Sequence, residues 1–204
     1  MNPYERYVLP WLIHWVMGAR LFEPYRRRVA AAARGRVLEV GIGSGYNLRH
    51  YGPDVEAVVG VDPSPHLLAR ADKAPRRAGL PLELHVLDAE RLPFADDSFD
   101  TVVMTWVLCS VPDVPTALAE LRRVLRPGGR LVFVEHGLAP EPGVQAWQRR
   151  LTPLWRPLAG GCHLDRPADA LLEAAGFRLE HLERGYGPGP HLLAYLYEGE
   201  AVAG

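Results

Sequence analysis

A cluster of glycines follows the first apolar run of the chain and is the strongest chemical signal in the sequence. The segment Val37-Leu-Glu-Val-Gly-Ile-Gly-Ser-Gly45 predicts a strand that ends in a turn. Glycines there let the backbone turn sharply and approach a ligand where a Cβ would collide. Asp62 ends the next apolar run, 62 − 41 = 21 residues after Gly41, and a carboxylate at that place can accept both hydroxyls of a ribose. The order strand, turn, helix, strand and acid therefore predicts a site for a nucleoside cofactor.

The spacing of the glycines discriminates between cofactors. The dinucleotide fingerprint GxGxxG needs glycine at position 46, where this chain has Tyr46, and its third glycine is Gly45 instead. A pyrophosphate favours a bare helix N-terminus with a cation nearby. Glu39 stands just before this turn and suits a ligand that carries positive charge. An NAD-dependent oxidoreductase is therefore the less favoured alternative.

The elements that must position these residues alternate along the chain. Short apolar runs predict strands at 36–41, 58–61, 82–87, 101–105, 130–135, 177–182 and 192–197. Helices are expected at 46–51, 63–74, 115–125, 144–158 and 167–176, the last of them capped by Asp165. Strands separated by helices need crossover connections. The sequence predicts an α/β fold: a doubly wound, seven-stranded, mostly parallel sheet with helices on both faces.

Composition narrows the class of protein. The 204 residues suit a single domain, and a net charge of −1 argues against a nucleic-acid partner held by a basic field. Cys109 and Cys162 lie far apart without CxxC spacing, which suits a reducing cytosol and predicts no metal site. No run of about 18 apolar residues is present, so no membrane-spanning helix is expected. These features predict a cytoplasmic protein.

The beginning of the chain has a character of its own. Residues 1–36 carry seven arginines against Glu5 and Glu23, a balance of 7 − 2 = +5, and they are rich in Tyr and Trp. We expect residues 1–35 to form a helical segment beside the domain at 36–204. This segment can act as a lid that supplies apolar walls, as a peripheral contact with the inner face of an anionic membrane, or as a cap on the sheet.

The residues resemble the class I S-adenosylmethionine-dependent methyltransferases, which have a Rossmann-like fold. Five landmarks in the expected order carry this resemblance over roughly residues 36–135: 37–45, Val59-Gly-Val-Asp-Pro-Ser64, Leu87-Asp-Ala-Glu90 with Leu92-Pro-Phe94, 98–103, and 125–131. The resemblance implies S-adenosyl-L-methionine as cofactor and a methyl-transferring enzyme. A module that binds this cofactor without catalysis is a further alternative.

The resemblance also implies roles for individual residues. Asp62 would hold the ribose hydroxyls, Asp88 would accept from the adenine amino group, and the backbone around Thr105 would meet the methionine ammonium. The full set of expected cofactor-binding residues is Glu39, Gly41, Gly43, Gly45, Asn47, Asp62, Pro63, Ser64, Asp88, Ala89, Glu90 and Thr105.

The methyl acceptor needs a nucleophilic lone pair opposite the departing sulfur. Thiols and phenols react best as anions, so a nearby base would help. His136 is the first candidate for this base and His163 the second. Other candidates near the expected strand ends are Cys109, which is most simply a small buried hydrophobe, Cys162, Asp165, Tyr186 and His191.

A narrower similarity concerns the acceptor. Segments 107–111, 134–136, 147–155, 161–164 and 188–191 resemble the alkyl thiol methyltransferases, and also the phospholipid N-methyltransferases and quinone C-methyltransferases. This similarity implies a small, apolar acceptor: a thiol, an amine or a quinol. The thiol enzymes carry a hydrophobic membrane-anchoring segment, whereas the longest apolar stretch here, Val8 to Ala19, is short and interrupted by Pro10 and His14.

Overall fold

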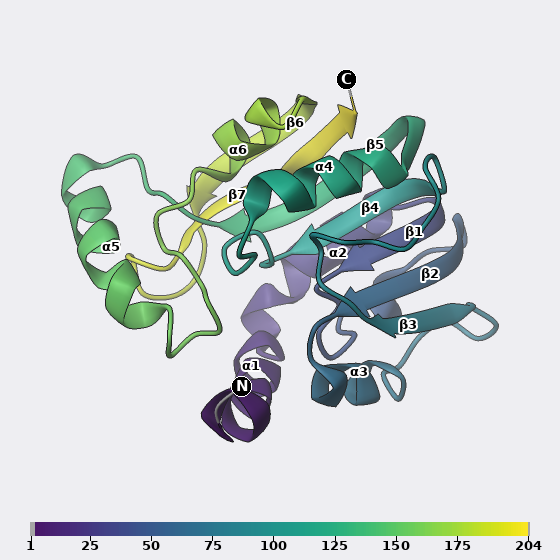
Figure 1. The fold of residues 1–204 in the computed structure, drawn as a ribbon, viewed down its shortest axis with the longest axis horizontal. Coiled ribbons are helices and arrows are strands. Elements are labelled where there is room, and N and C mark those ends of the chain that lie inside the picture. The colour runs from purple at the N-terminus through teal and green to yellow at the C-terminus, as the bar shows by residue number, and fades with distance from the viewer. Residues whose placement is uncertain (1–2, 204) are drawn as a thin grey trace.

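The computed structural model describes residues 3–203 and is built around one seven-stranded sheet (Figure 1). The strand order across the sheet is β3-β2-β1-β4-β5-β7-β6. The strands are β1 Gly35–Val40, β2 Val55–Asp62, β3 Leu82–Val86, β4 Phe99–Thr105, β5 Leu125–His136, β6 Phe177–Tyr186 and β7 Tyr195–Ala203. Strands β1 to β5 pair in parallel, and only β7 runs antiparallel to its neighbours β5 and β6. The predicted doubly wound, mostly parallel sheet is confirmed.

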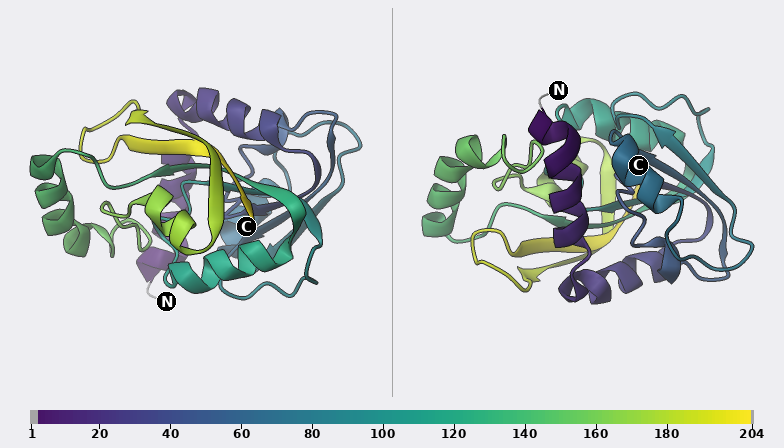
Figure 2. Two further views of the ribbon diagram at one scale, coloured as in Figure 1. Left: turned by 90° about the horizontal axis from the view of Figure 1, so that it is seen from above. Right: turned by 90° about the horizontal axis from the view of Figure 1, so that it is seen from below.

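Helices cover both faces of this sheet. They are α1 Leu9–Met17, α2 Glu23–Ala32, α3 Pro65–Ala71, α4 Val114–Val124, α5 Pro142–Trp155 and α6 Ala168–Ala174, with short turns η1 Tyr4–Val8, η2 Arg20–Phe22 and η3 Leu48–His50. Figure 2 shows α2 and α4 on opposite sides of the strands. α3 shares its apolar core with α2, and α6 shares its core with α4.

Alternation along β1 separates the two layers of the core. Leu38 and Val40 pack in the layer of α4 and α6, whereas Val37 packs in the layer of α2 and α3. Parallel strands covered on both faces need near-continuous apolar runs, as β1 and β4 have. Phe99 and Phe133 are fully buried, and burying such a side chain contributes about 1.5–3 kcal/mol. This core fixes the strand ends from which the site is built.

Three local expectations are wrong. Asp165 does not cap α6, whose N-cap is Pro167 without a side-chain bond; Asp165 accepts a hydrogen bond from the Thr152 hydroxyl at 3.2 Å. The helix expected at 46–51 is a single 3-10 turn, because Gly45 adopts φ +75° before it and the backbone becomes extended at Tyr51.

The last strand begins three residues later than expected. A turn closed by Leu193 N–H donating to the Pro190 carbonyl occupies the preceding residues, and β7 then continues to Ala203.

The residues that precede β1 fold against the rest of the chain. α1 lies beyond the ends of the strands, near α3, and α2 runs behind the sheet (Figure 1). α1 has nine residues, and within residues 3–203 no helix combines the length and apolarity required to cross a membrane.

Candidate active site

A cavity of about 1070 Å³ lies at the carboxyl ends of β1, β2 and β4. Open α/β sheets bind ligands at this edge. One side is polar and comes from the turns after these strands, with Asp62, Asp88 and Thr105 on its wall. The other side comes from α1 and the turn at 156–161 and is mainly apolar, with His14 and Arg156 as its polar members. The cavity is therefore chemically divided, which suits a polar cofactor and an apolar second ligand.

Asp62 is held in place by the backbone of its neighbours. Its Oδ2 accepts from Gly43 N–H at 3.0 Å, and its Oδ1 accepts from Ser64 N–H at 2.8 Å. Burial raises the pKa of Asp62, and the two backbone bonds act in the opposite direction. A carboxylate oriented in this way keeps further lone pairs for the two hydroxyls of a ribose.

Glycine is required in the turn after β1 for two reasons, the backbone conformation and the space around the Cα atoms. Gly41 and Gly43 have φ of +62° and +55°, values that side chains with a Cβ adopt at a cost of roughly 1–2 kcal/mol. A Cβ at Gly41 would collide with the Val107 side chain, whereas a Cβ at Gly43 would find no atom of the chain closer than 3.8 Å. The space beside Gly43 therefore belongs to the cavity, and the residues present fit a nucleoside cofactor.

A buried polar network supports this turn from behind. Glu39 is 1% exposed and accepts from Asn47 Nδ2 and from the Tyr51 hydroxyl, both at 2.8 Å. Asn47 also donates to Thr105 Oγ1 at 3.2 Å and accepts from Arg26 Nη1 at 3.1 Å. Burial raises the pKa of Glu39 to about 7. The network links the turn after β1 to the end of β4 and to α2.

The cavity wall contains most, but not all, of the residues expected to bind the cofactor. Those on the wall are Gly41, Gly43, Asp62, Pro63, Ser64, Asp88, Ala89, Glu90 and Thr105. Glu39 and Asn47 lie behind it in the buried network, and Gly45 packs the turn onto α3, where a Cβ would press on Leu48 and Ala71. These three residues lie outside the wall, and their assignment to cofactor binding stays a prediction.

Neither histidine expected as a base lines the cavity. His136, at the end of β5, lies with its Nε2 3.1 Å from Cys162 Sγ. The Nδ1 of His163 lies 3.8 Å from an Asp165 oxygen. The catalytic assignment of both residues stays a prediction.

The structure reveals a histidine in the cavity wall that the sequence reasoning did not select. His14 Nδ1 lies 2.8 Å from Ser44 Oγ and 2.9 Å from the Tyr46 hydroxyl, and its ring stacks on Tyr46. Burial, assisted by the charge of Arg70, lowers the pKa of His14. The spacing of Pro10, His14 and Met17 on one side of a helix is the signal that could have indicated a wall-forming face.

Trp106 and Arg26 are also part of this wall and were not expected there. Trp106 adopts φ +57°, an uncommon conformation for a bulky side chain that clusters at functional sites. Its ring packs against Phe22 at 4.8 Å between centroids, and the Arg26 guanidinium lies 5.1 Å from its centroid. Burial lowers the pKa of Arg26 to about 10. These long-range contacts join α2 to the end of β4.

The comparisons with known proteins agree with this geometry. The family model described as "Methyltransferase domain" matches residues 38–133. The chain is 38% identical to thiol S-methyltransferase TMT1B of Rattus norvegicus over 168 aligned residues. This alignment covers 77% of this chain and 68% of the relative. It is 43% identical over 131 residues to a phosphatidylethanolamine N-methyltransferase of Cereibacter sphaeroides, over 62% of this chain and 64% of the relative.

The fold likeness extends to solved structures. An S-adenosylmethionine-dependent methyltransferase from Mesorhizobium loti superimposes with a TM-score of 0.66 at 22% identity, over 91% of this chain and 99% of the other. With the strand order, the glycine turn and the acid at the end of β2, these findings assign the family. The chain belongs to the class I S-adenosylmethionine-dependent methyltransferases.

Proposed function

We propose that this methyltransferase acts on a small apolar acceptor, with an alkyl thiol as the first choice. The observation that carries the proposal is the divided cavity, whose polar side fits S-adenosylmethionine and whose other side is mainly apolar. The similarity to a thiol S-methyltransferase supports sulfur as the acceptor atom. An amine, favoured by the phosphatidylethanolamine relative, or a quinol is the alternative.

On the cofactor side the residues of the chain bind and orient. Asp62 would accept hydrogen bonds from the ribose hydroxyls, and Asp88 and the Ala89 amide would bind the adenine. Gly43 lets the backbone approach the ligand, while Glu39 holds the turn from behind. The bound cofactor supplies an electrophilic methyl group on a sulfonium. Positioning and exclusion of water are the main contributions that the protein can make to such a transfer.

On the acceptor side α1 provides the apolar wall. Leu9, Ile13 and Met17 line the cavity from this helix, and Trp106 and Val107 line it from the turn after β4. An alkyl group placed between these walls loses contact with water, and each buried CH₂ contributes about 0.8 kcal/mol. We therefore propose that residues 1–35 act as a lid over the acceptor.

A thiol acceptor must lose its proton to become reactive. His14 and His66 both line the cavity, but His14 stands on α1, the wall that we assign to the acceptor, whereas His66 stands on α3 and is exposed. The lowered pKa of His14 keeps its ring in the neutral, proton-accepting form. We place His14 ahead of His136 and His163 for this role, because catalysis needs the base within reach of the reacting atom. The hydroxyls of Ser44 and Tyr46 would orient its ring.

The length of the acceptor tests this proposal. We expect KM to fall about fourfold for each CH₂ added to a series of linear alkyl thiols, because burying each CH₂ contributes about 0.8 kcal/mol to binding. The readout is methyl transfer from labelled S-adenosylmethionine at saturating cofactor. A KM that does not depend on chain length, or a preference for short charged thiols, would contradict an apolar acceptor site.

The outer face of α1 suggests where the acceptor comes from. Trp11 and Trp15 are 53% and 70% exposed, and they continue an apolar strip with Tyr7 and Val16. The exposed Arg6 and Arg20 flank this strip in the chain. Aromatic and basic side chains suit the interface of an anionic membrane. We propose a peripheral contact through this face, which would place the cavity close to apolar acceptors dissolved in the bilayer.

Vesicle flotation examines the membrane contact. The double change Trp11→Ser and Trp15→Ser is expected to reduce binding to vesicles that contain anionic phospholipid. Val86→Ser, which removes a 57% exposed apolar side chain from β3, serves as the control and should bind as the unchanged protein does. Equal flotation of all three proteins would exclude this face as the contact.

A further inference from the structure

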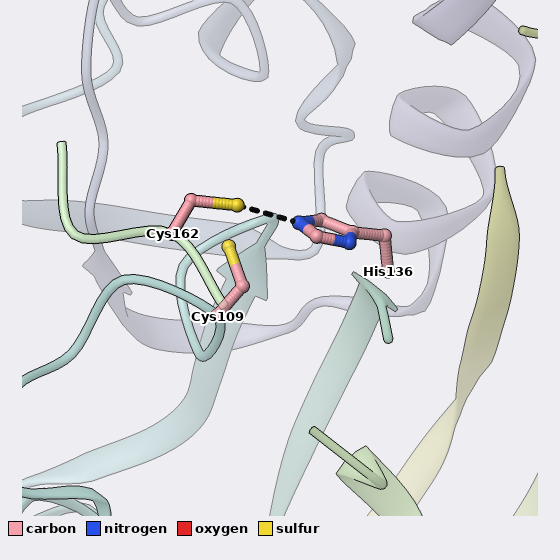
Figure 3. A group of neighbouring side chains, drawn as sticks. All are labelled: Cys109, His136 and Cys162. Atoms are coloured by element: carbon pink, nitrogen blue, oxygen red, sulfur yellow. Dashed lines mark hydrogen bonds between the residues drawn. The ribbon is translucent and has the colours of Figure 1, made fainter. Parts of the chain in front are cut away.

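Behind the apolar wall of the cavity, three metal-ligating side chains meet that are far apart in the sequence. Cys109, His136 and Cys162 offer ligand atoms that all lie within 4.8 Å of one another. Figure 3 shows the two thiols and the imidazole directed toward one another, and the closest pair is His136 Nε2 with Cys162 Sγ at 3.1 Å. Spacing along the chain predicted no metal site, because each ligand comes from a different element.

The backbone around this cluster is fixed by hydrogen bonds. The turn that carries Cys109 is held by Val107 N–H donating to the buried Glu135 carboxylate at 2.9 Å. His163 N–H donates to the Cys109 carbonyl at 2.8 Å and so ties the two cysteine-bearing segments together. His136 is the last residue of β5 and pairs with β7. The ligands therefore need little rearrangement to close on an ion.

The surroundings favour a soft, electrically neutral complex. Cys109 and Cys162 are 4% and 8% exposed and pack with Leu164 in an apolar cluster. A divalent cation bound by two thiolates carries no net charge, which avoids the cost of burying an ion. The neighbouring cation, Arg166, is engaged with the carbonyls of Leu108 and Val111.

We propose that Cys109, His136 and Cys162 bind one Zn²⁺ ion. Two sulfurs and one imidazole nitrogen are a ligand set that zinc accepts with a fourth position left for water or an exogenous ligand. His136 would bind through Nε2, while its Nδ1, which has no hydrogen-bond partner among the described residues, carries the proton. Binding converts two thiols to thiolates and releases two protons, with no change in oxidation state. The ion would connect the turn after β4, the end of β5 and the turn after α5 behind the acceptor wall.

Cobalt substitution tests this site directly. The full-length protein, reduced and treated with chelator, is titrated with Co²⁺ and then with Zn²⁺ under anaerobic conditions. We expect one equivalent of Co²⁺ to produce a thiolate-to-metal charge-transfer band with tetrahedral d–d bands, and Zn²⁺ to remove them. Cys109→Ser, Cys162→Ser and His136→Gln should each weaken binding at least about tenfold. His181→Gln, at an exposed histidine on β6, should bind as the unchanged protein does.

Each contrary result has a clear meaning. Binding that is equal in the cysteine variants would show an adventitious ion only, and titration without the charge-transfer band would show that no site exists. Formation of a Cys109–Cys162 disulfide in air that Zn²⁺ does not retard would identify a redox pair instead. If the variants fail to fold, the unchanged protein still tests the proposal. A charge-transfer band with Co²⁺ and a rise in Tm with Zn²⁺ support the site, and the absence of both excludes it. A changed pH–rate profile in His136→Gln with zinc binding intact would assign this residue as a base and overturn the proposal.

Discussion

The Asp62 carboxylate is oriented for a ligand by backbone amides of other residues. Two amide N–H groups, from Gly43 and Ser64, orient its oxygens at the end of β2. Both amides belong to turns that line the cavity. The geometry leaves the carboxylate with acceptor capacity, which is the property that binding a ribose requires.

Asp62→Asn is therefore expected to weaken the binding of S-adenosylmethionine about 10- to 100-fold, since hydrogen bonds to charged groups contribute about 1.5–3 kcal/mol. Calorimetric titration measures the change. Asp54→Asn, at an exposed position before β2, is the matched control and should retain full affinity. Unchanged binding by Asp62→Asn would remove this residue from the cofactor site.

The raised pKa of Glu39 predicts how the free energy of unfolding depends on pH. Burial raises its pKa from the ordinary value of 4.5 to about 7, so the folded protein binds the proton more tightly than the unfolded chain does. Stability from this group is fully present below about pH 4.5 and is lost as the pH rises to about 7, a change of about 3 kcal/mol. In Glu39→Gln this contribution is absent. Urea unfolding of both proteins between pH 5 and 8 should show their free energies of unfolding moving apart; parallel curves would refute the assignment.

At the scale of elements, the turn after β1 combines a backbone requirement with a binding requirement. Gly43 and Gly79 both have positive φ, +55° and +77°, and a Cβ at either would meet no close atom of the chain. They differ in position, because Gly43 lines the cavity and Gly79 lies in the loop before β3.

The matched pair Gly43→Ala and Gly79→Ala separates the two requirements. Both changes should lower the free energy of unfolding by roughly 1–2 kcal/mol, from the left-handed backbone alone. Only Gly43→Ala should also weaken S-adenosylmethionine binding, because its methyl group projects into the cofactor space. Equal affinity in the two variants would mean that the ligand does not approach this turn.

At the scale of the whole molecule, α1 connects the first part of the chain to the cavity. Ile13 lines the cavity on one face of this helix, and Trp15 is exposed on another. We expect Ile13→Ala to raise the KM for an alkyl thiol about 5- to 30-fold, equivalent to about 1–2 kcal/mol of lost apolar contact, with cofactor affinity unchanged. Trp15→Ala should leave both constants as they are when the thiol is water-soluble. An unaltered KM for Ile13→Ala would contradict the lid.

The fold was predictable from the sequence to the extent that its signals are local. The apolar runs, the glycine turn and Asp62 stand close together in the chain, and each reports one element of a parallel sheet. Contacts over long separations were not predictable: His14 meets Tyr46 across 32 residues, and Cys162 meets His136 across 26. Spacing carries no information about such pairs, because the packing of α1 and of the turn after α5 decides them.

The central claim is that this cavity transfers a methyl group from S-adenosylmethionine to a small apolar thiol. The most direct measurement supplies tritiated-methyl S-adenosylmethionine with equal concentrations of an alkyl thiol, a phospholipid amine and a quinol, and identifies the labelled product by mass spectrometry. The predicted result is a labelled thioether as the main product, strongly reduced in Asp62→Asn. A labelled methylamine or methylated quinol as the main product, or transfer that is undiminished in Asp62→Asn, would contradict the account.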